Sequence, residues 1–170
     1  MIIVYTGDGK GKTSAAVGQT IRALGRDMRV VFAQLLKRPG QAGEQAMLAR
    51  MLGDDFLAGG LGFLRKEEQR PAHRKAALDT LAWAAGRFDT SRPDMLVLDE
   101  ALYALNMRLI DRDDLTPFVA AAQAEPPCHL VLTGRGLPPD LAARADLITE
   151  MTPIKHPYES GVQAQEGIEF

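Results

Sequence analysis

The stretch that decides the fold is Tyr5-Thr6-Gly7-Asp8-Gly9-Lys10-Gly11-Lys12-Thr13-Ser14, which directly follows the apolar residues 1–4. This pattern predicts a strand, a glycine-rich loop and the start of a helix. Glycines tolerate the positive φ angles with which backbone N–H groups turn inward toward a polyanion. The helix expected over residues 13–24 would point its positive dipole end at the same anion.

The two residues after the last loop glycine complete a phosphate-binding P-loop. Lys12 adds a mobile ammonium and Thr13 adds a hydroxyl suited to Mg²⁺. The usual spacing, G-x-x-x-x-G-K-[ST], places Thr6 where the first glycine is expected, so the strict motif is missed by one residue. A glycine-rich surface turn would explain the glycines, but it would not explain why Lys12 and Thr13 open a helix. We therefore predict that residues 7–14 bind phosphate.

A second chemical landmark is the acidic pair Asp99-Glu100, which follows the apolar residues 95–98. The apolar run predicts a buried strand, and carboxylates at its end are costly unless they face a cation or hydrogen-bond donors. A Walker B acid does this by holding Mg²⁺ opposite the P-loop hydroxyl. A charge pair at a helix N-terminus is the alternative interpretation, and the P-loop earlier in the chain favours the metal site.

Composition bounds the class of protein. The chain has 170 residues, 46% of them hydrophobic and 25% charged, which predicts one globular domain over residues 1–170. The net charge of -2 gives no electrostatic argument for nucleic acid as a partner. Cys128 is the only cysteine, so an internal disulfide is excluded and a reducing compartment is expected. We see no signal peptide and no apolar run near the ~20 residues of a membrane span, so we expect a cytoplasmic protein without a membrane partner.

Alternating strand and helix patterns predict the fold class. Further strands are expected over residues 29–36, 95–98, 128–133 and 146–150, and further helices over residues 43–52, 67–87, 111–124 and 139–145. Pro126 and Pro127 should end the helix over 111–124. Because the chemical landmarks fall at strand ends, we predict an α/β, P-loop NTPase-like (RecA-like) domain whose mostly parallel sheet has helices on both faces. Residues 54–65 are expected to form a flexible loop with an exposed aromatic ring.

Several other residues are placed by this fold. Gln34, Lys37 and Arg38 follow the second strand and should share the rim of the sheet with the P-loop. Solvated charges on a turn would explain the last two equally well. Arg135, between two glycines after the strand over 128–133, could reach phosphate from the same rim. His73 is expected to be a solvated residue on a helix face.

Four segments resemble the P-loop corrinoid adenosyltransferases: TGDGKGKTSAA (6–16), VLDEALYAL (97–105), LTGRGLPPDLAARADLITEM (132–151) and PIKHPYESGVQAQEGIEF (153–170). The C-terminal block is much more specific than any P-loop. The resemblance implies an enzyme that transfers the 5′-deoxyadenosyl group of ATP to the cobalt(I) of a reduced corrinoid, either cobalamin or cobyrinic acid a,c-diamide, and releases triphosphate. Cobalt(I) is then the nucleophile. The protein has to orient ATP and neutralise the leaving group.

The resemblance also implies roles for residues. Lys12 and Thr13 would be the catalytic pair, and Thr13 and Glu100 would hold Mg²⁺, with Asp99 beside them as a ligand or in support. The substrate-binding residues would be Gly7, Asp8, Gly9, Lys10, Gly11, Lys12, Thr13, Ser14, Arg22, Phe63 and Arg135, of which Arg22 and Phe63 would face the corrinoid. A homodimer and a flavoprotein reductase are the partners implied, beside the substrates ATP and corrinoid.

One segment departs from the family pattern. Relatives often carry G-F-T-W where this chain has Gly62-Phe63-Leu64-Arg65, and in them apolar side chains of this segment press on the lower face of the corrin to exclude its axial ligand. Phe63 is kept, but Arg65 replaces the tryptophan. A P-loop ATP-binding protein that acts as a corrinoid carrier, a sensor or an NTPase is therefore the alternative function.

Overall fold

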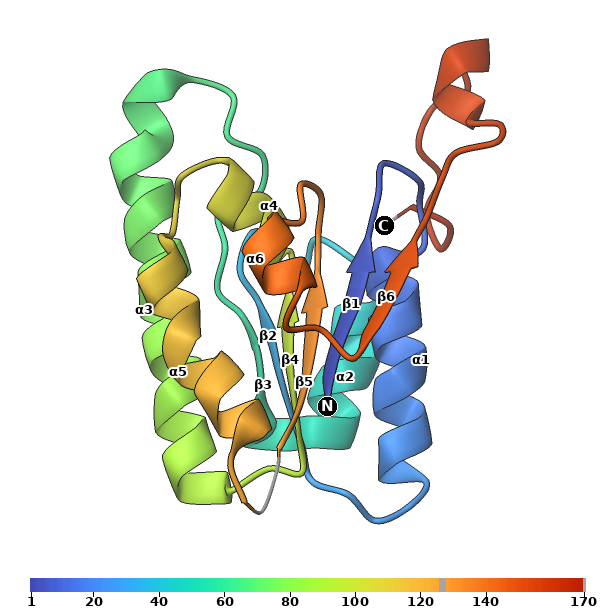
Figure 1. Cartoon of the computed structure of the whole chain (residues 1–170). Coiled ribbons are helices and arrows are strands. Elements are labelled where there is room, and N and C mark those ends of the chain that lie inside the picture. The colour runs from blue at the N-terminus through green and yellow to red at the C-terminus, as the bar shows by residue number, and fades with distance from the viewer. Residues whose placement is uncertain (126–127, 170) are drawn as a thin grey trace.

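A six-stranded parallel sheet forms the centre of the molecule (Figure 1). The structure is a computed structural model that describes residues 1–125 and 128–169, so the predicted helix stop at Pro126 and Pro127 lies outside the described residues. The strand order is β3-β2-β4-β5-β1-β6. The strands are β1 (Ile2–Thr6), β2 (Val30–Gln34), β3 (Phe56–Ala58), β4 (Met95–Asp99), β5 (His129–Thr133) and β6 (Leu147–Glu150).

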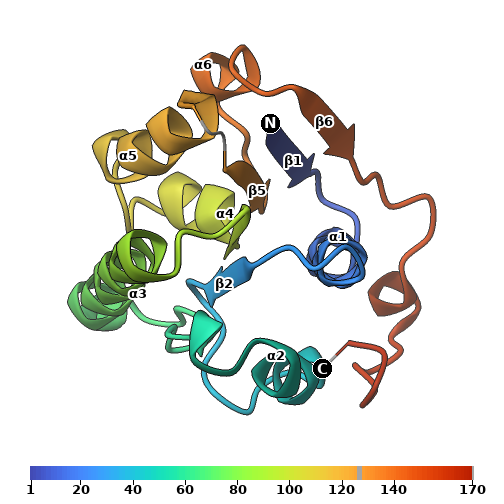
Figure 2. The ribbon, with the colours of Figure 1, turned by 90° about the horizontal axis from the view of Figure 1, so that it is seen from below.

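Helices cover both faces of this sheet (Figure 2). One face carries α1 (Lys12–Leu24) and α2 (Glu44–Leu52), and the other carries α3 (Arg70–Ser91), α4 (Ala101–Asn106), α5 (Arg112–Gln123) and α6 (Pro139–Ala142). Short 3-10 turns occupy Gly53–Asp55, Glu67–Gln69 and Pro157–Ser160. The predicted fold class, an α/β sheet with helices on both faces, is confirmed. None of the helices described is both long enough and apolar enough to span a bilayer.

The central strands are buried because their side chains alternate between two apolar layers. Leu96, Leu98 and Leu130 contact the helices α3 to α5, whereas Val97 and Val131 pack beneath α1 and α2. Each fully buried aliphatic side chain of this size contributes about 1.5–3 kcal/mol of transfer free energy. The near-continuous apolar composition of the strands is therefore what forces the sheet into the middle.

The strand order determines where the chemical landmarks meet. In a parallel sheet all carboxyl ends lie at one edge, and β5 lies between β1 and β4. The P-loop and the acidic pair are therefore only two strand spacings apart, about 10 Å. Gln34 at the end of β2 is in register with Asp99 at the end of β4. Short side chains can bridge these distances, so the sheet itself assembles the site.

Two elements were not predicted from the sequence. The segment expected to be a flexible loop contains β3, which pairs Phe56 with Phe32 of β2, their ring centroids 6.2 Å apart. Three residues next to glycines are too few to show a strand period, and tertiary pairing decides their conformation. The helix α4 is similarly short. The long helix expected over 67–87 begins three residues later and ends at Ser91. Pro71 lies in its first turn, where the backbone N–H that proline lacks would have no acceptor within the helix.

The C-terminal tail follows β6 and returns over the carboxyl ends of the strands (Figure 1). Its described residues form irregular segments and turns, including the 3-10 turn over Pro157–Ser160 and a turn over 166–169. The backbone N–H of Met151 donates to the carbonyl of Thr6 at 2.8 Å, which continues the β1–β6 pairing. The tail therefore starts against the P-loop.

Candidate functional site

The N-terminus of α1 opens into a cleft of about 580 Å³. Gly11 precedes the helix with φ at +105°, and no side chain caps the first turn. The first N–H groups of a helix have no acceptor within it, so here they remain available to an anion. Among the predicted residues, those that line the cleft are Gly9, Lys10, Gly11, Lys12, Thr13, Ser14, Phe63, Glu100 and Arg135.

The first half of the loop packs against the tail. The N–H of Gly9 donates to the carbonyl of Met151 at 2.6 Å, so the prediction that this N–H points at a polyanion is wrong. A Cβ on Gly7 or Gly9 would lie 2.5 Å or 2.7 Å from the Met151 carbonyl oxygen. These two glycines are needed because backbone approaches backbone. Gly7 does not line the cleft.

Lys12 folds back over the loop. Its Nζ donates to the carbonyl oxygens of Gly7 at 2.8 Å and Gly9 at 2.6 Å. Burial lowers the pKa of Lys12, and the Glu100 carboxylate partly offsets this effect. The Lys12 ammonium therefore stabilises the loop through two backbone carbonyls, and its side chain also lines the cleft.

Asp99 lies fully buried behind the cleft and accepts four hydrogen bonds. Its Oδ1 accepts from the hydroxyls of Thr13 at 2.9 Å and Thr133 at 2.7 Å. Its Oδ2 accepts from Gln34 Nε2 at 3.0 Å and Lys37 Nζ at 3.3 Å. A buried carboxylate needs this degree of satisfaction. Of the two roles left open for Asp99, support of the Thr13 hydroxyl is the one these contacts favour.

Lys37 is the nearest cation to this carboxylate. Its Nζ lies 3.0 Å from Thr13 Oγ1 and 2.8 Å from Oε1 of Glu44, at the start of α2. Burial alone would lower the pKa of Lys37, but Asp99 and Glu44 raise it above its ordinary value. Lys37 therefore lies on the rim of the site, as predicted. The alternative interpretation, a solvated charge on a turn, does not fit these contacts.

Glu100 lines the cleft from the start of α4. Its N–H donates to Thr133 Oγ1 at 2.8 Å, and its φ of +61° turns the chain sharply out of β4. Burial and the neighbouring Asp99 raise the pKa of Glu100. An ionised Glu100 is therefore destabilising until a cation approaches it.

The oxygens around Thr13 fit a hard cation, because a Lys37 ammonium already lies among Thr13, Asp99 and Glu44. Within residues 1–125 and 128–169, no three His, Cys, Asp or Glu side chains form a metal-binding group. Mg²⁺ in nucleotide sites usually takes one or two protein ligands and completes its shell with water and phosphate. The donor set therefore suits Mg²⁺ that arrives with a nucleotide.

Arg135 and Lys10 lie on the rim of the cleft. Arg135 Nη2 donates to the carbonyl of Asp8 at 3.3 Å, and its Nε lies 3.7 Å from the Asp8 carboxylate. Asp8 thus orients Arg135 and does not line the cleft. Lys10 pairs with Glu169 of the tail at 2.8 Å. A phosphate group in the cleft would compete with these carboxylates for both cations.

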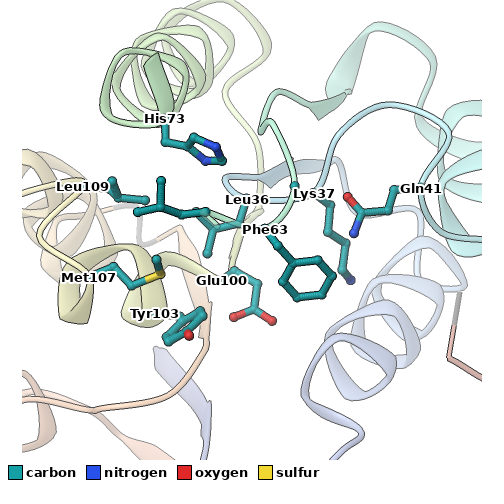
Figure 3. A pocket seen from close by; sticks show the side chains of 11 residues that line it. Leu36, Lys37, Gln41, Phe63, His73, Glu100, Tyr103, Met107 and Leu109 are labelled. Atoms are coloured by element: carbon teal, nitrogen blue, oxygen red, sulfur yellow. The ribbon is translucent and has the colours of Figure 1, made fainter. Parts of the chain in front are cut away.

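Next to the cleft lies a smaller pocket of about 160 Å³, whose lining Figure 3 shows and which shares Phe63 with the cleft. Phe63 is 75% exposed, and it contributes to the walls of both cavities. His73 lies on the opposite wall and points into the pocket, only 6% exposed, so the expectation of a solvated histidine is wrong. Among the residues described, no group hydrogen-bonds to the His73 ring.

Two residues with predicted or questioned roles lie outside the cavities. Arg22 is exposed in the last turn of α1, nine residues beyond Thr13 and hence about 14 Å along the helix. The structure does not bring it together with the P-loop. Arg65, in the position of the family tryptophan, is exposed, and its N–H donates to Gln69 Oε1 at 3.3 Å.

Sequence reasoning missed Glu44, Tyr103 and the tail residues Gly167 to Glu169, all of which line the cleft. Tyr103 stands three residues after Glu100, and helical spacing could have found it. The tail shows no periodicity, so only its folding back over the loop reveals its position. Cys128 is buried as expected, and burial raises the pKa of its thiol to about 11.

The chain is similar to known proteins over its whole length. Residues 1–170 match the family described as ATP:corrinoid adenosyltransferase BtuR/CobO/CobP. A corrinoid adenosyltransferase of Pseudomonas aeruginosa is 36% identical over 100% of this chain and 83% of its own length. One from a Sinorhizobium species is 37% identical over 100% and 80%. Corrinoid adenosyltransferase CobA of Salmonella typhimurium is 36% identical over 100% and 85%.

The contact between loop and tail predicts opposite effects for two glycines near each other in the chain. Gly9→Ala should lower the free energy of unfolding by about 1–3 kcal/mol, because the new Cβ collides with the Met151 backbone. Gly18→Ala, within α1 and with nothing within 4 Å of its added Cβ, should raise it by about 0.5–1 kcal/mol. Urea denaturation measures both, and a Gly9→Ala variant as stable as the parent chain would contradict the contact.

The raised pKa of Glu100 predicts a pH-dependent stability effect. A carboxyl whose folded pKa exceeds its unfolded value stabilises the fold at low pH, and that stabilisation is lost as pH rises through the folded pKa. Glu100→Gln should therefore raise the melting temperature at pH 7, because the neutral amide carries no buried charge. This difference in melting temperature between the variant and the parent chain should shrink toward pH 4. Thermal melts without added metal or nucleotide test this, and a variant that melts lower at pH 7 would refute it.

Proposed function

This chain belongs to the ATP:corrinoid adenosyltransferase family, whose members transfer the 5′-deoxyadenosyl group of ATP to the cobalt of a reduced corrinoid, and we propose that the cleft above α1 is where it does so. The observation that carries the proposal is the uncapped N-terminus of α1, bordered by Lys10, Lys12 and Arg135. Four features of this end attract a polyanion: open N–H groups, the helix dipole, buried ammonium charge and a guanidinium.

The triphosphate of ATP is proposed to lie over residues 10–14. In the reaction cobalt(I) attacks the ribose C5′, and the C5′–O bond breaks with its electron pair passing to the triphosphate. The chain therefore needs no general base. Its cations stabilise the charge that develops on the leaving oxygen, which is the kind of term that dominates many enzymatic rate enhancements.

Mg²⁺ is proposed to be held by the Thr13 hydroxyl and the Glu100 carboxylate. When bound, the ion would neutralise phosphate charge and fix the position of the leaving group. Asp99 supports this site through its hydrogen bond from Thr13. The raised pKa of Glu100 fits the proposal, because a carboxylate disfavoured in the empty chain gains most from an incoming cation.

The corrinoid is proposed to bind against Phe63. A further cleft of about 650 Å³, lined by Lys10, Arg38, Phe63 and tail residues, adjoins the phosphate cleft, and the two share Lys10 and Phe63. Together they leave room for a large flat ligand beside the nucleotide. The apolar pocket behind Phe63 gives the ring space to move when a corrin edge enters.

Arg22 belongs to a different surface. A corrinoid contact by Arg22 requires a second copy of the chain, because its own cleft lies at the other end of α1. We accordingly propose a homodimer, cytoplasmic location and electron supply by a flavoprotein reductase, all of which rest on the family resemblance.

A carrier, sensor or NTPase with the same fold is the second candidate, favoured by the exposed Arg65 in place of tryptophan. One assay separates the functions: anaerobic incubation with ATP, Mg²⁺ and chemically reduced corrinoid. Light-sensitive adenosylcorrinoid with equimolar triphosphate is expected. Orthophosphate released without corrinoid would instead identify an NTPase, and corrinoid binding without product would identify a carrier or sensor.

Lys12→Ala tests the role of the loop in this assay. Removing the ammonium should lower turnover at least about 100-fold, because one lost donor to a developing anion costs about 10²–10³. Lys75→Ala is the control, since Lys75 pairs only with Asp79 on the exposed face of α3. Near-normal turnover of Lys12→Ala would remove the basis of the proposal.

Phe63→Ala tests the corrinoid contact separately. Removing the exposed ring should lower kcat/KM for corrinoid about tenfold. This corresponds to the loss of roughly 1.4 kcal/mol of contact free energy. ATP affinity should not change. Leu61→Ala, also exposed and two residues away, is the matched control. Equal kinetics of the two variants would exclude Phe63 from the corrinoid site.

A further inference from the structure

Lys37 occupies an unusual place in the site. Its ammonium touches Thr13 Oγ1, Asp99 Oδ2 and Glu44 Oε1, at 3.0, 3.3 and 2.8 Å. Thr13 Oγ1 already donates its proton to Asp99 Oδ1. The oxygen keeps two lone pairs, and one of them accepts from Lys37, so a metal ion bound to this hydroxyl would have to share it with the ammonium.

A metal ion on Thr13 would repel this ammonium. Mg²⁺ approaches its oxygen ligands to about 2.0–2.1 Å, so an ion bound to Thr13 would lie within a few ångström of Lys37 Nζ. Two cations at that separation repel strongly in a partly buried site. The Lys37 side chain is only 21% exposed and Asp99 is fully buried, so little solvent screens the repulsion.

We propose that Lys37 is a tethered counter-cation, a positioning residue that takes the place of the metal ion in the ligand-free chain and is displaced when the metal enters with the nucleotide. The inference rests on the proposed Mg²⁺ site. Glu44 keeps the displaced ammonium near the cleft, because it forms the shortest of the three contacts and itself lines the cleft. There the ammonium faces the phosphate oxygens.

This exchange couples metal and phosphate binding. A metal ion alone has to displace Lys37 into a site already rich in cations. A bound triphosphate gives the displaced ammonium new acceptors, so it strengthens metal binding, and by linkage the metal strengthens triphosphate binding by the same factor. Meanwhile Lys37 holds Asp99 and Thr13 in position before the ligands arrive.

The test is a titration of the intact chain with Mn²⁺, in which electron paramagnetic resonance measures free Mn²⁺ with and without inorganic tripolyphosphate. In Lys37→Met, which has a similar length but no charge, Mn²⁺ should bind at least about tenfold tighter without tripolyphosphate. Tripolyphosphate should then enhance Mn²⁺ binding less than it does in the parent chain. Unchanged or weaker Mn²⁺ binding by Lys37→Met overturns the proposal.

Two further variants make the result specific. Lys37→Gln keeps a hydrogen-bond donor for the buried Asp99 and replaces Lys37→Met in the titration if that variant has a low melting temperature. The same tenfold increase in Mn²⁺ affinity is expected, and its absence overturns the proposal equally. Arg38→Met removes the neighbouring charge without touching Thr13 or Asp99, and should change Mn²⁺ affinity by no more than about twofold, since exposed charges are screened. An equal increase in the Mn²⁺ affinity of Arg38→Met would reduce the effect to general charge and refute the exchange of Lys37 for the metal ion.

If the parent chain binds no tripolyphosphate at all, the proposed function fails, whereas the Mn²⁺ titrations without tripolyphosphate still decide whether Lys37 is exchanged for the metal ion.

Discussion

The buried carboxylate of Asp99 is the constraint on which the site depends. An ionised carboxylate without solvent costs several kcal/mol unless donors surround it, and here the donors come from four separate parts of the chain: α1, the end of β2, the segment after β2 and the end of β5. To satisfy Asp99 is therefore to fix the relative positions of the P-loop and three strand ends. These contacts connect the four segments because a buried charge without donors would be destabilising.

A second constraint acts on the loop from outside. The tail passes so close to Gly7 and Gly9 that neither position accepts a Cβ, and Met151 takes the N–H of Gly9. Gly7 and Gly9 thus form a packing surface for the tail, whereas residues 9–14 line the cleft. Glycines in such a loop answer two different demands, close backbone contact and anion binding, which the sequence pattern does not separate.

Three cations around the cleft are paired with carboxylates of the chain itself. They are Lys10, Lys37 and Arg135, which contact Glu169, Glu44 and Asp8 in that order. These pairs satisfy the cations and reduce repulsion among them, and in the function that we propose phosphate would compete for the same cations. Glu100 is the exception, with burial and Asp99 both opposing its ionised form. Sites often hold such a cost where a ligand will remove it.

The sequence by itself determined the sheet, the P-loop and the acidic pair, because apolar runs, glycine spacing and charges at strand ends are local signals with local physical causes. It also predicted that Lys12, Thr13, Glu100 and Arg135 share one rim of the sheet, and all four line one cleft. The resemblance grouped Phe63 with Arg22, and of these two only Phe63 lines that cleft. Only the tertiary structure decided three other features of the site. These are the burial of His73, the contacts of Lys37 and the packing of the tail against the loop. Those depend on strand order and on segments far apart in the chain, 62 residues for Lys37 and Asp99 and more than a hundred for Gly9 and Met151, and no pattern within a short window records such contacts.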